Sequence, residues 1–248
     1  RVDLGWMQRM WPNLPCFLPF GFCNVGDNFL KYCVIEKRYG ETIIKKRGDQ
    51  MTTYKHILYE KKGPIARVKL NRSHYRNAQS QLMLEEMDAA FQGAIEDRDV
   101  RVIILSGEGD HFSSGHDLGT PEENEDQLTR GYPAGPSGVC EKFEKIYLEY
   151  GLRWRDLPKP TIAMVQGYCI FGGWQIASSM DIIVAAEDTM FLPGFVEYFS
   201  VPWDIGFRKA KEILFQSRFV HAQEALELGF VNRVVPRDRL ESEAMALA

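Results

Sequence analysis

Short apolar runs alternate with longer segments of helical periodicity through most of this chain, and that alternation limits what it can fold into. The apolar runs are RVIIL at 101–105, TIAMV at 161–165 and DIIVAAE at 181–187. Strands that alternate with helices imply right-handed crossovers and a largely parallel sheet. The sequence therefore predicts an α/β fold.

The remaining segments predict a hairpin, two helices and one irregular stretch. HILYE and IARVKLN flank the turn KKGP, a pattern typical of a β-hairpin. Residues 80–97 and 140–157 have helical spacing, and in the first of them one buried stripe is predicted at Leu84, Met87, Phe91, Ala94 and Ile95. Residues 120–139 are polar and contain Pro and Gly, so we expect a flexible lid or a pocket wall without regular structure.

The first fifty residues differ from the rest of the chain. They are rich in Trp, Phe, Cys and Pro and show no sustained period, whereas the periodic signals start at about Met51. We therefore expect residues 1–50 to be an N-terminal extension of unknown role and residues 51–248 to form one domain.

Composition narrows the classes of partner. The 248 residues carry a net charge of -4, without a long block of like charge that would bind nucleic acid. No apolar stretch approaches the roughly 18 residues of a membrane-spanning helix. The five cysteines are an odd number without Cys-x-x-Cys spacing, which disfavours a disulfide framework and a zinc site. We expect a cytoplasmic protein with no nucleic-acid or membrane partner.

The loop GEGDHFSSGHDL at 107–118 follows the first buried run and contains Gly-x-Gly. A dinucleotide-binding loop needs a third glycine, and Phe112 stands where that glycine would be. The spacing of His111 and His116 fits no common metal-ligand pair. The loop therefore predicts neither a dinucleotide site nor a metal site.

A second loop changes the interpretation of the first. KPTIAMVQGYCIFGGWQIASSMDIIVAAEDTMFLP at 159–193, taken together with HFSSGHDL and with AQEALELGFVNRVV at 222–235, resembles the enoyl-CoA hydratase/isomerase superfamily, the crotonases. The resemblance runs from about Met51 to the C-terminus. It implies a crotonase-like ββα spiral with largely parallel sheets, a helical C-terminal part that looks truncated, and a homotrimer or hexamer.

The resemblance also implies a reaction chemistry. The backbone amides of His116 and Gly172 correspond to the two donors that stabilise negative charge on a thioester oxygen. Coenzyme A would be the substrate carrier, with no tightly bound cofactor and no metal. Its adenine would lie against the main chain near Asp117 and Leu118, and its phosphates would lie near Arg72 and Arg76.

The chain departs from the family pattern at the acids. Gln175 stands where hydratases have the first of two glutamates, and an amide is no general base. Phe195 takes the second position unless a shift of register brings Glu197 there. Asp204 is either an active acid or a helix N-cap.

These departures leave several functions open. The first is an acyl-CoA-processing enzyme of the hydratase/isomerase type that stabilises an enolate or oxyanion. The alternatives are an acyl-CoA hydrolase, a ring-opening crotonase and an acyl-CoA-binding pseudoenzyme, since the glutamates are missing.

Overall fold

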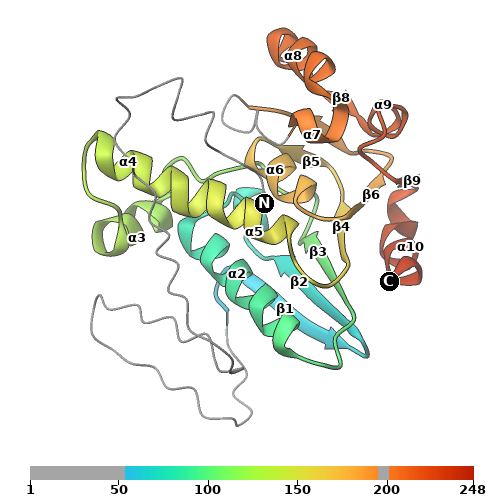
Figure 1. Cartoon of the computed structure of the whole chain (residues 1–248), viewed down its shortest axis with the longest axis horizontal. Helices are drawn as coiled ribbons and strands as arrows, with labels where there is room; N and C mark the ends of the chain where they lie inside the picture. The colour runs from blue at the N-terminus through green and yellow to red at the C-terminus, as the bar shows by residue number, and fades with distance from the viewer. Residues whose placement is uncertain (1–53, 195–200) are drawn as a thin grey trace, which may run out of the picture. The chain divides into compact units, whose positions relative to one another are not determined.

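The computed structural model describes residues 54–194 and 201–248, which form a six-stranded sheet, a small three-stranded sheet and surrounding helices (Figure 1). The large sheet has the strand order β1-β2-β3-β4-β6-β9, with β1 antiparallel to β2 and all other pairs parallel. Its strands are β1 (Ile57–Lys62), β2 (Ile65–Leu70), β3 (Val102–Gly107), β4 (Thr161–Val165), β6 (Ile182–Ala186) and β9 (Arg233–Val235). This confirms the predicted hairpin and the largely parallel α/β fold.

The small sheet consists of β5 (Tyr168–Ile170), β7 (Met190–Leu192) and β8 (Val220–His221). In it β5 pairs with β7 in parallel, and β7 pairs with β8 antiparallel. Because β5 begins only three residues after β4 ends, the chain passes directly from the large sheet into the small one. The segment that contains Gly172 follows β5.

The helix α2 (Gln81–Glu96) confirms the prediction for residues 80–97. Ser80 is its N-cap, and the serine hydroxyl accepts a hydrogen bond from the amide of Met83. Its buried side chains include Leu84 and Phe91, which lie on the predicted stripe.

The predicted helix at 140–157 is part of an unbroken helical stretch from residue 136 to residue 155. It comprises α4 (Pro136–Lys142), the π-helical segment η2 (Phe143–Glu149) and α5 (Tyr150–Arg155). Figure 1 shows this stretch beside α2, on the same side of the large sheet. The π-helical middle has no counterpart in the sequence prediction.

The prediction for residues 120–139 is wrong on regular structure, because this region contains α3 (Pro121–Arg130) and the start of α4. Thr120 is the N-cap of α3, and its hydroxyl accepts a hydrogen bond from the amide of Glu123. The sequence TPEE therefore has the features of a helix start, with Pro at the first position and acids in the first turn.

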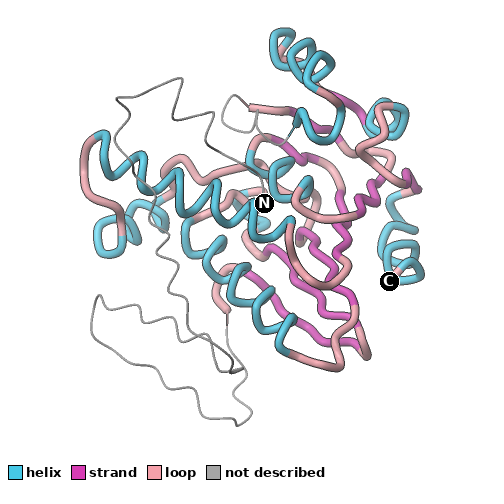
Figure 2. Tube along the Cα trace, viewed as in Figure 1, coloured by secondary structure: helices cyan, strands magenta, loops and turns pink. Residues whose placement is uncertain are grey.

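Helices cover both faces of the large sheet (Figure 2). One face packs against α2 and the 136–155 stretch in the main core, and the other face packs its own core against α10. The remaining helices are η1 (Ser73–Tyr75), α6 (Gly172–Ser178), α7 (Val201–Ile205), α8 (Phe207–Gln216), α9 (Ala222–Glu227), η4 (Arg237–Arg239) and α10 (Leu240–Leu247). In the described ranges, no helix has the length and apolar character to cross a membrane. The predicted boundary at residue 50 lies outside the described residues and stays a prediction.

Candidate active site

The two loops singled out in the sequence lie side by side because β3 and β4 are neighbouring parallel strands. The first loop follows β3, and β4 leads into β5 and then α6. A parallel bridge joins Ser113 to Cys169: the Ser113 amide donates to Tyr168 O at 2.9 Å, and the Ile170 amide donates to Ser113 O at 3.1 Å. Three residues further along both segments, this register reaches His116 and Gly172.

The close approach of the loops requires glycine on both sides. A Cβ on Gly115 would lie 2.8 Å from the Cβ of Phe171 and 3.1 Å from the amide nitrogen of Gly172. A Cβ on Gly172 would lie 2.6 Å from Cε1 and 2.8 Å from Nδ1 of His116. Gly115 also has a φ of +93°, which favours glycine. A larger residue at either position would force the loops apart.

The amides of His116 and Gly172 are the predicted oxyanion donors. His116 forms a parallel bridge with Gln79, in which the Gln79 amide donates to Gly115 O at 2.8 Å and the Asp117 amide donates to Gln79 O at 2.9 Å. Such a bridge uses the peptide groups on either side of His116, so the amide of His116 itself points away from Gln79. Gly172 is the first residue of α6, where amides have no acceptor within the helix. The structure thus brings the two predicted donors together.

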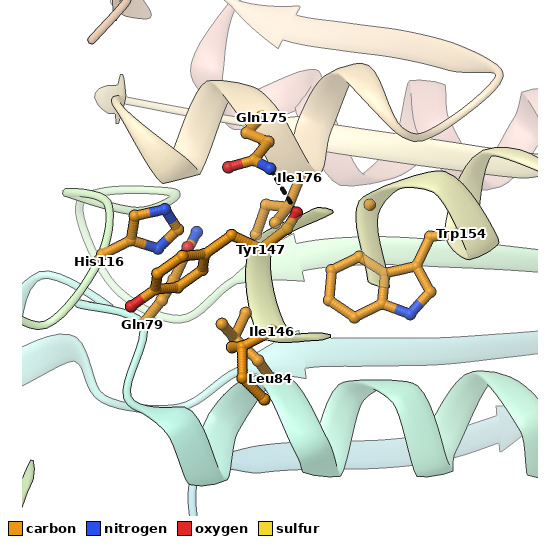
Figure 3. Close-up of a pocket in the computed structure, with 9 residues that line it drawn as sticks. Gln79, Leu84, His116, Ile146, Tyr147, Trp154, Gln175 and Ile176 are labelled. Atoms are coloured by element: carbon orange, nitrogen blue, oxygen red, sulfur yellow. Dashed lines mark hydrogen bonds between the residues drawn. The ribbon is translucent and has the colours of Figure 1, made fainter. Parts of the chain in front are cut away.

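The imidazole of His116 lies between Gln175 and Tyr147 (Figure 3). Its ring centroid is 4.0 Å from that of Tyr147. Burial, together with the nearby charge of Lys142, lowers the pKa of His116 to about 4, although a hydrogen bond with Gln175 partly opposes the shift. His116 is therefore neutral at pH 7.

Gln175 links α6 to the π-helical segment. Its side chain is buried, and Nε2 donates to the main-chain oxygen of Tyr147 at 2.7 Å. Figure 3 shows the amide nitrogen directed toward Tyr147 and the amide oxygen on the side of His116. Sequence reasoning singled out Gln175 but not its contact with Tyr147.

Two cavities meet at His116, Phe143 and Tyr147. One has a volume of about 510 Å³ and is lined by His116, Cys140, Phe143, Glu144, Tyr147, Leu148 and Gln175. The other has a volume of about 390 Å³ and extends along residues 117–119, α3 and α4. Both volumes fall in the range of small-ligand sites.

Asp204 lies within α7, and the N-cap of α8 is Gly206, so the predicted N-cap role of Asp204 is wrong. Burial raises the pKa of Asp204 to about 6, although Ser178, Arg155 and Trp174 act to lower it. Trp174 and Ser178 are four residues apart and share one face of α6, about a quarter turn from Gln175. Asp204 is not among the residues that line the two described cavities at His116. Glu197 lies outside the described residues.

The two predicted phosphate-binding arginines are placed differently. The Arg72 side chain is 1% exposed and is paired with Asp117, whose side chain is equally buried, so its guanidinium is not accessible from the surface. Arg76 is exposed, and its main-chain oxygen accepts a hydrogen bond from the Ser114 amide at 2.9 Å. Leu118 is 97% exposed. Arg76 and Leu118 therefore remain accessible beside the first loop, whereas Arg72 does not.

The described part of the chain contains no group of three or more His, Cys, Asp or Glu side chains placed to hold a metal ion.

Comparison with known proteins gives the family. Residues 60–248 match the family model described as enoyl-CoA hydratase/isomerase. A Mycobacterium tuberculosis protein named as an enoyl-CoA hydratase is 37% identical over 225 residues, which cover 82% of this chain and 70% of that protein. The structure of a Mycobacterium smegmatis protein named as an enoyl-CoA hydratase is 43% identical, with a TM-score of 0.70, and the match covers 78% of this chain and 77% of that one.

A third relative extends the match to another genus. The structure of an enoyl-CoA hydratase/isomerase from Xanthobacter autotrophicus Py2 is 37% identical, with a TM-score of 0.70, and the match covers 79% of this chain and 72% of that one. The family match, the fold and the sequence identity agree, and this chain belongs to the enoyl-CoA hydratase/isomerase family, the crotonase superfamily.

Proposed function

We propose that this chain polarises the thioester carbonyl of an acyl-CoA between the amides of His116 and Gly172 and so stabilises an enolate or oxyanion. The observation that carries the proposal is the close approach of the two loops, where a Cβ on Gly115 would lie 3.1 Å from the Gly172 nitrogen. Two preorganised amides aimed at one oxygen stabilise the charge that develops on it. Each such donor contributes a factor of about 10² to 10³ in rate.

The acyl group occupies the 510 Å³ cavity beside His116 and Gln175 in this proposal. Coenzyme A lies against the exposed residues of the first loop, with Arg76 near a phosphate. Arg72 does not take that role because its side chain is buried in an ion pair. Coenzyme A is the substrate carrier, and no other cofactor takes part.

Proton transfer is assigned to a carboxylate other than residue 175, because Gln175 does not ionise. Glu197 and Asp204 are the two candidates. Turnover by an Asp204→Asn variant distinguishes the two candidates, since unchanged turnover would mean that Asp204 does not transfer the proton.

The site assembles within one chain in this proposal, and the protein acts in the cytoplasm as a homotrimer or hexamer. The oligomeric state is measured by light scattering during size-exclusion chromatography. A monomeric protein with full activity would contradict that part of the proposal.

A chromophoric thioester tests the polarisation directly. The absorption of 4-dimethylaminocinnamoyl-CoA moves to longer wavelength when its carbonyl oxygen is polarised, so the shift reports on the two amides without a need for turnover. We expect a red shift with the native chain. We expect it to disappear in Gly172→Ala, because the added methyl group collides with the His116 ring.

Gly93→Ala is the matched control for this experiment. Gly93 lies in α2, and a Cβ there has no neighbour within 4 Å. This variant should retain the full red shift. A native chain that binds the probe without any shift would contradict the proposed function and favour an acyl-CoA-binding pseudoenzyme.

A further inference from the structure

Arg72 follows β2 and carries a buried guanidinium that joins three segments of the chain. Nη1 donates to the main-chain oxygen of Ala78 at 2.6 Å and to Oδ2 of Asp117 at 2.9 Å. Nη2 donates to Oγ1 of Thr120 at 3.1 Å and to Oε2 of Glu122 at 3.2 Å. One side chain therefore contacts the 73–78 turn, the first loop and the start of α3.

Asp117 connects the Arg72 guanidinium to the backbone of the first loop. Its Oδ1 accepts hydrogen bonds from the amides of Gly119 at 3.0 Å and Thr120 at 2.8 Å, and its Oδ2 accepts one from the Thr120 hydroxyl at 2.6 Å. The Asp117 amide donates to Gln79 O at 2.9 Å. The peptide unit next to the His116 amide is thus held from both ends.

We propose that Arg72 is a positioning residue that fixes the His116 amide through Asp117 and holds α3 through Glu122. This inference rests on the proposed function, because the His116 amide matters only if it contacts the thioester oxygen. It gives Arg72 a role in the reaction without contact to the substrate.

The contact of the guanidinium with Asp117 (the Asp117 arm) and its contact with Glu122 (the Glu122 arm) have separate consequences. The Asp117 arm controls the direction of one donor, and a displacement of about 1 Å in such a group can lower a rate about 100-fold. The Glu122 arm holds α3, which provides Glu123, Asn124 and Gln127 to the wall of the 390 Å³ cavity. Glu122 is 38% exposed, so this arm is the weaker of the two.

Each arm is cut by its own substitution. Asp117→Asn keeps an oxygen for the amides of Gly119 and Thr120 but removes the charge that faces Arg72. Glu122→Gln removes the charge of the other arm, although its amide oxygen remains an acceptor for Arg72. Arg72→Met removes both, and Arg72→Lys retains the charge while losing the planar group that reaches several acceptors.

Arg67→Met is the matched control. Arg67 lies in β2, and Arg72 lies just beyond the end of the same strand. The guanidinium of Arg67 also contacts two carboxylates, Glu60 at 3.1 Å and Glu241 at 2.7 Å. Those contacts lead to β1 and to α10, away from the first loop. This variant therefore measures the effect of losing a doubly paired arginine without disturbing the first loop.

The readouts are the red shift of bound 4-dimethylaminocinnamoyl-CoA at saturation, its Kd, and the melting temperature. We expect Asp117→Asn and Arg72→Met to bind the probe with most of the red shift lost, and enoyl-CoA turnover to fall about 100-fold. The double variant Asp117→Asn/Arg72→Met should be no worse than Arg72→Met alone, because the Arg72–Asp117 contact is already lost in Arg72→Met. Glu122→Gln should keep the full shift and raise the Kd about threefold.

The failures of the two proposals are distinguishable. A native chain without a red shift overturns the proposed function and this inference with it. A native shift that Gly172→Ala abolishes but Arg72→Met and Asp117→Asn retain overturns this inference alone. If Arg72→Met does not fold, Arg72→Lys and Asp117→Asn carry the test, and a full shift in both overturns it. A loss of shift in Arg67→Met equal to that in Arg72→Met would overturn it as well.

Discussion

Gln175 donates its side-chain amide to the main-chain oxygen of Tyr147 at 2.7 Å. The contact joins α6 to the π-helical segment η2 and helps to keep the Tyr147 ring against His116. π-Helical segments occur often at functional sites. The glutamine is therefore part of the architecture of the cavity.

Gln175→Glu should destabilise the fold in a pH-dependent way. At neutral pH a buried carboxylate would face the Tyr147 carbonyl, and loss of the donor should cost about 1–3 kcal/mol. Burial raises the pKa of such a carboxyl. The variant should therefore be closest to the native chain below about pH 4, the unfolded pKa of Glu, and lose stability as the pH rises through the folded pKa.

Urea unfolding at pH 5 and pH 8 measures this effect. Gln223→Glu is the control, because Gln223 is exposed on α9 and its substitution should change stability little at either pH. Equal stability of Gln175→Glu and the native chain at pH 8 would show that the contact with Tyr147 contributes nothing.

Gly115→Ala should abolish the red shift of the cinnamoyl probe, whereas Gly135→Ala should not. Both glycines have a positive φ, +93° and +95°, so both substitutions carry similar backbone strain of about 1–3 kcal/mol. Only at Gly115 does the new methyl group also meet Phe171 and the Gly172 amide. Absorption spectra of the two variants with the probe, together with their melting temperatures, distinguish the effect of backbone strain from the effect of moving the two loops apart. A full shift in Gly115→Ala would contradict the proposed geometry.

Arg76→Ala should weaken the binding of CoA about tenfold, the loss expected for one charge-assisted contact to a phosphate. Arg76 is exposed beside the first loop, so the contact should also weaken as salt increases. Titration calorimetry with CoA at two salt concentrations measures both effects. Arg98→Ala, at an exposed site after α2, is the control. An unchanged Kd for Arg76→Ala would remove Arg76 from the CoA site.

Much of the fold follows from local periodicity. The apolar spacing of Leu84 and Phe91 places α2 within a residue of its predicted ends, and the run TIAMV coincides with β4. The error over residues 120–139 has a local cause, because Thr120 and the acids after Pro121 form a helix start that general polarity concealed. Such a signal is recoverable from sequence when capping is considered.

The site was less predictable because its contacts join distant residues. His116 and Gly172 were identified through the family motifs, but nothing local in the sequence pairs Arg72 with Asp117, 45 positions away. The same holds for Gln175, whose partner is a main-chain oxygen in a helix. Main-chain partners carry no side-chain signature, so no pattern of residues indicates that contact.

Asp204→Asn should stabilise the protein at alkaline pH. Burial raises the pKa of Asp204 to about 6 in the folded chain, well above its ordinary value of 3.8. Below pH 3.8 the carboxyl is neutral in both the folded and the unfolded chain, and the protein has its full stability. Because the folded pKa is raised, the free energy of unfolding falls as the pH rises from 3.8 to about 6. At pH 8 the ionised group opposes folding by about 3 kcal/mol, and a neutral amide removes that opposition.

Thermal unfolding of Asp204→Asn and the native chain between pH 4 and pH 8 tests this reasoning. The two melting temperatures should nearly coincide at pH 4, separate as the pH rises from 4 to about 6 and stay apart up to pH 8, with the variant higher. Asp238→Asn, at an exposed position in η4, is the control and should show no such divergence. A variant that melts below the native chain at pH 8 would mean that the ionised carboxylate is stabilised in the fold, because contacts with Ser178, Arg155 and Trp174 would then outweigh its burial.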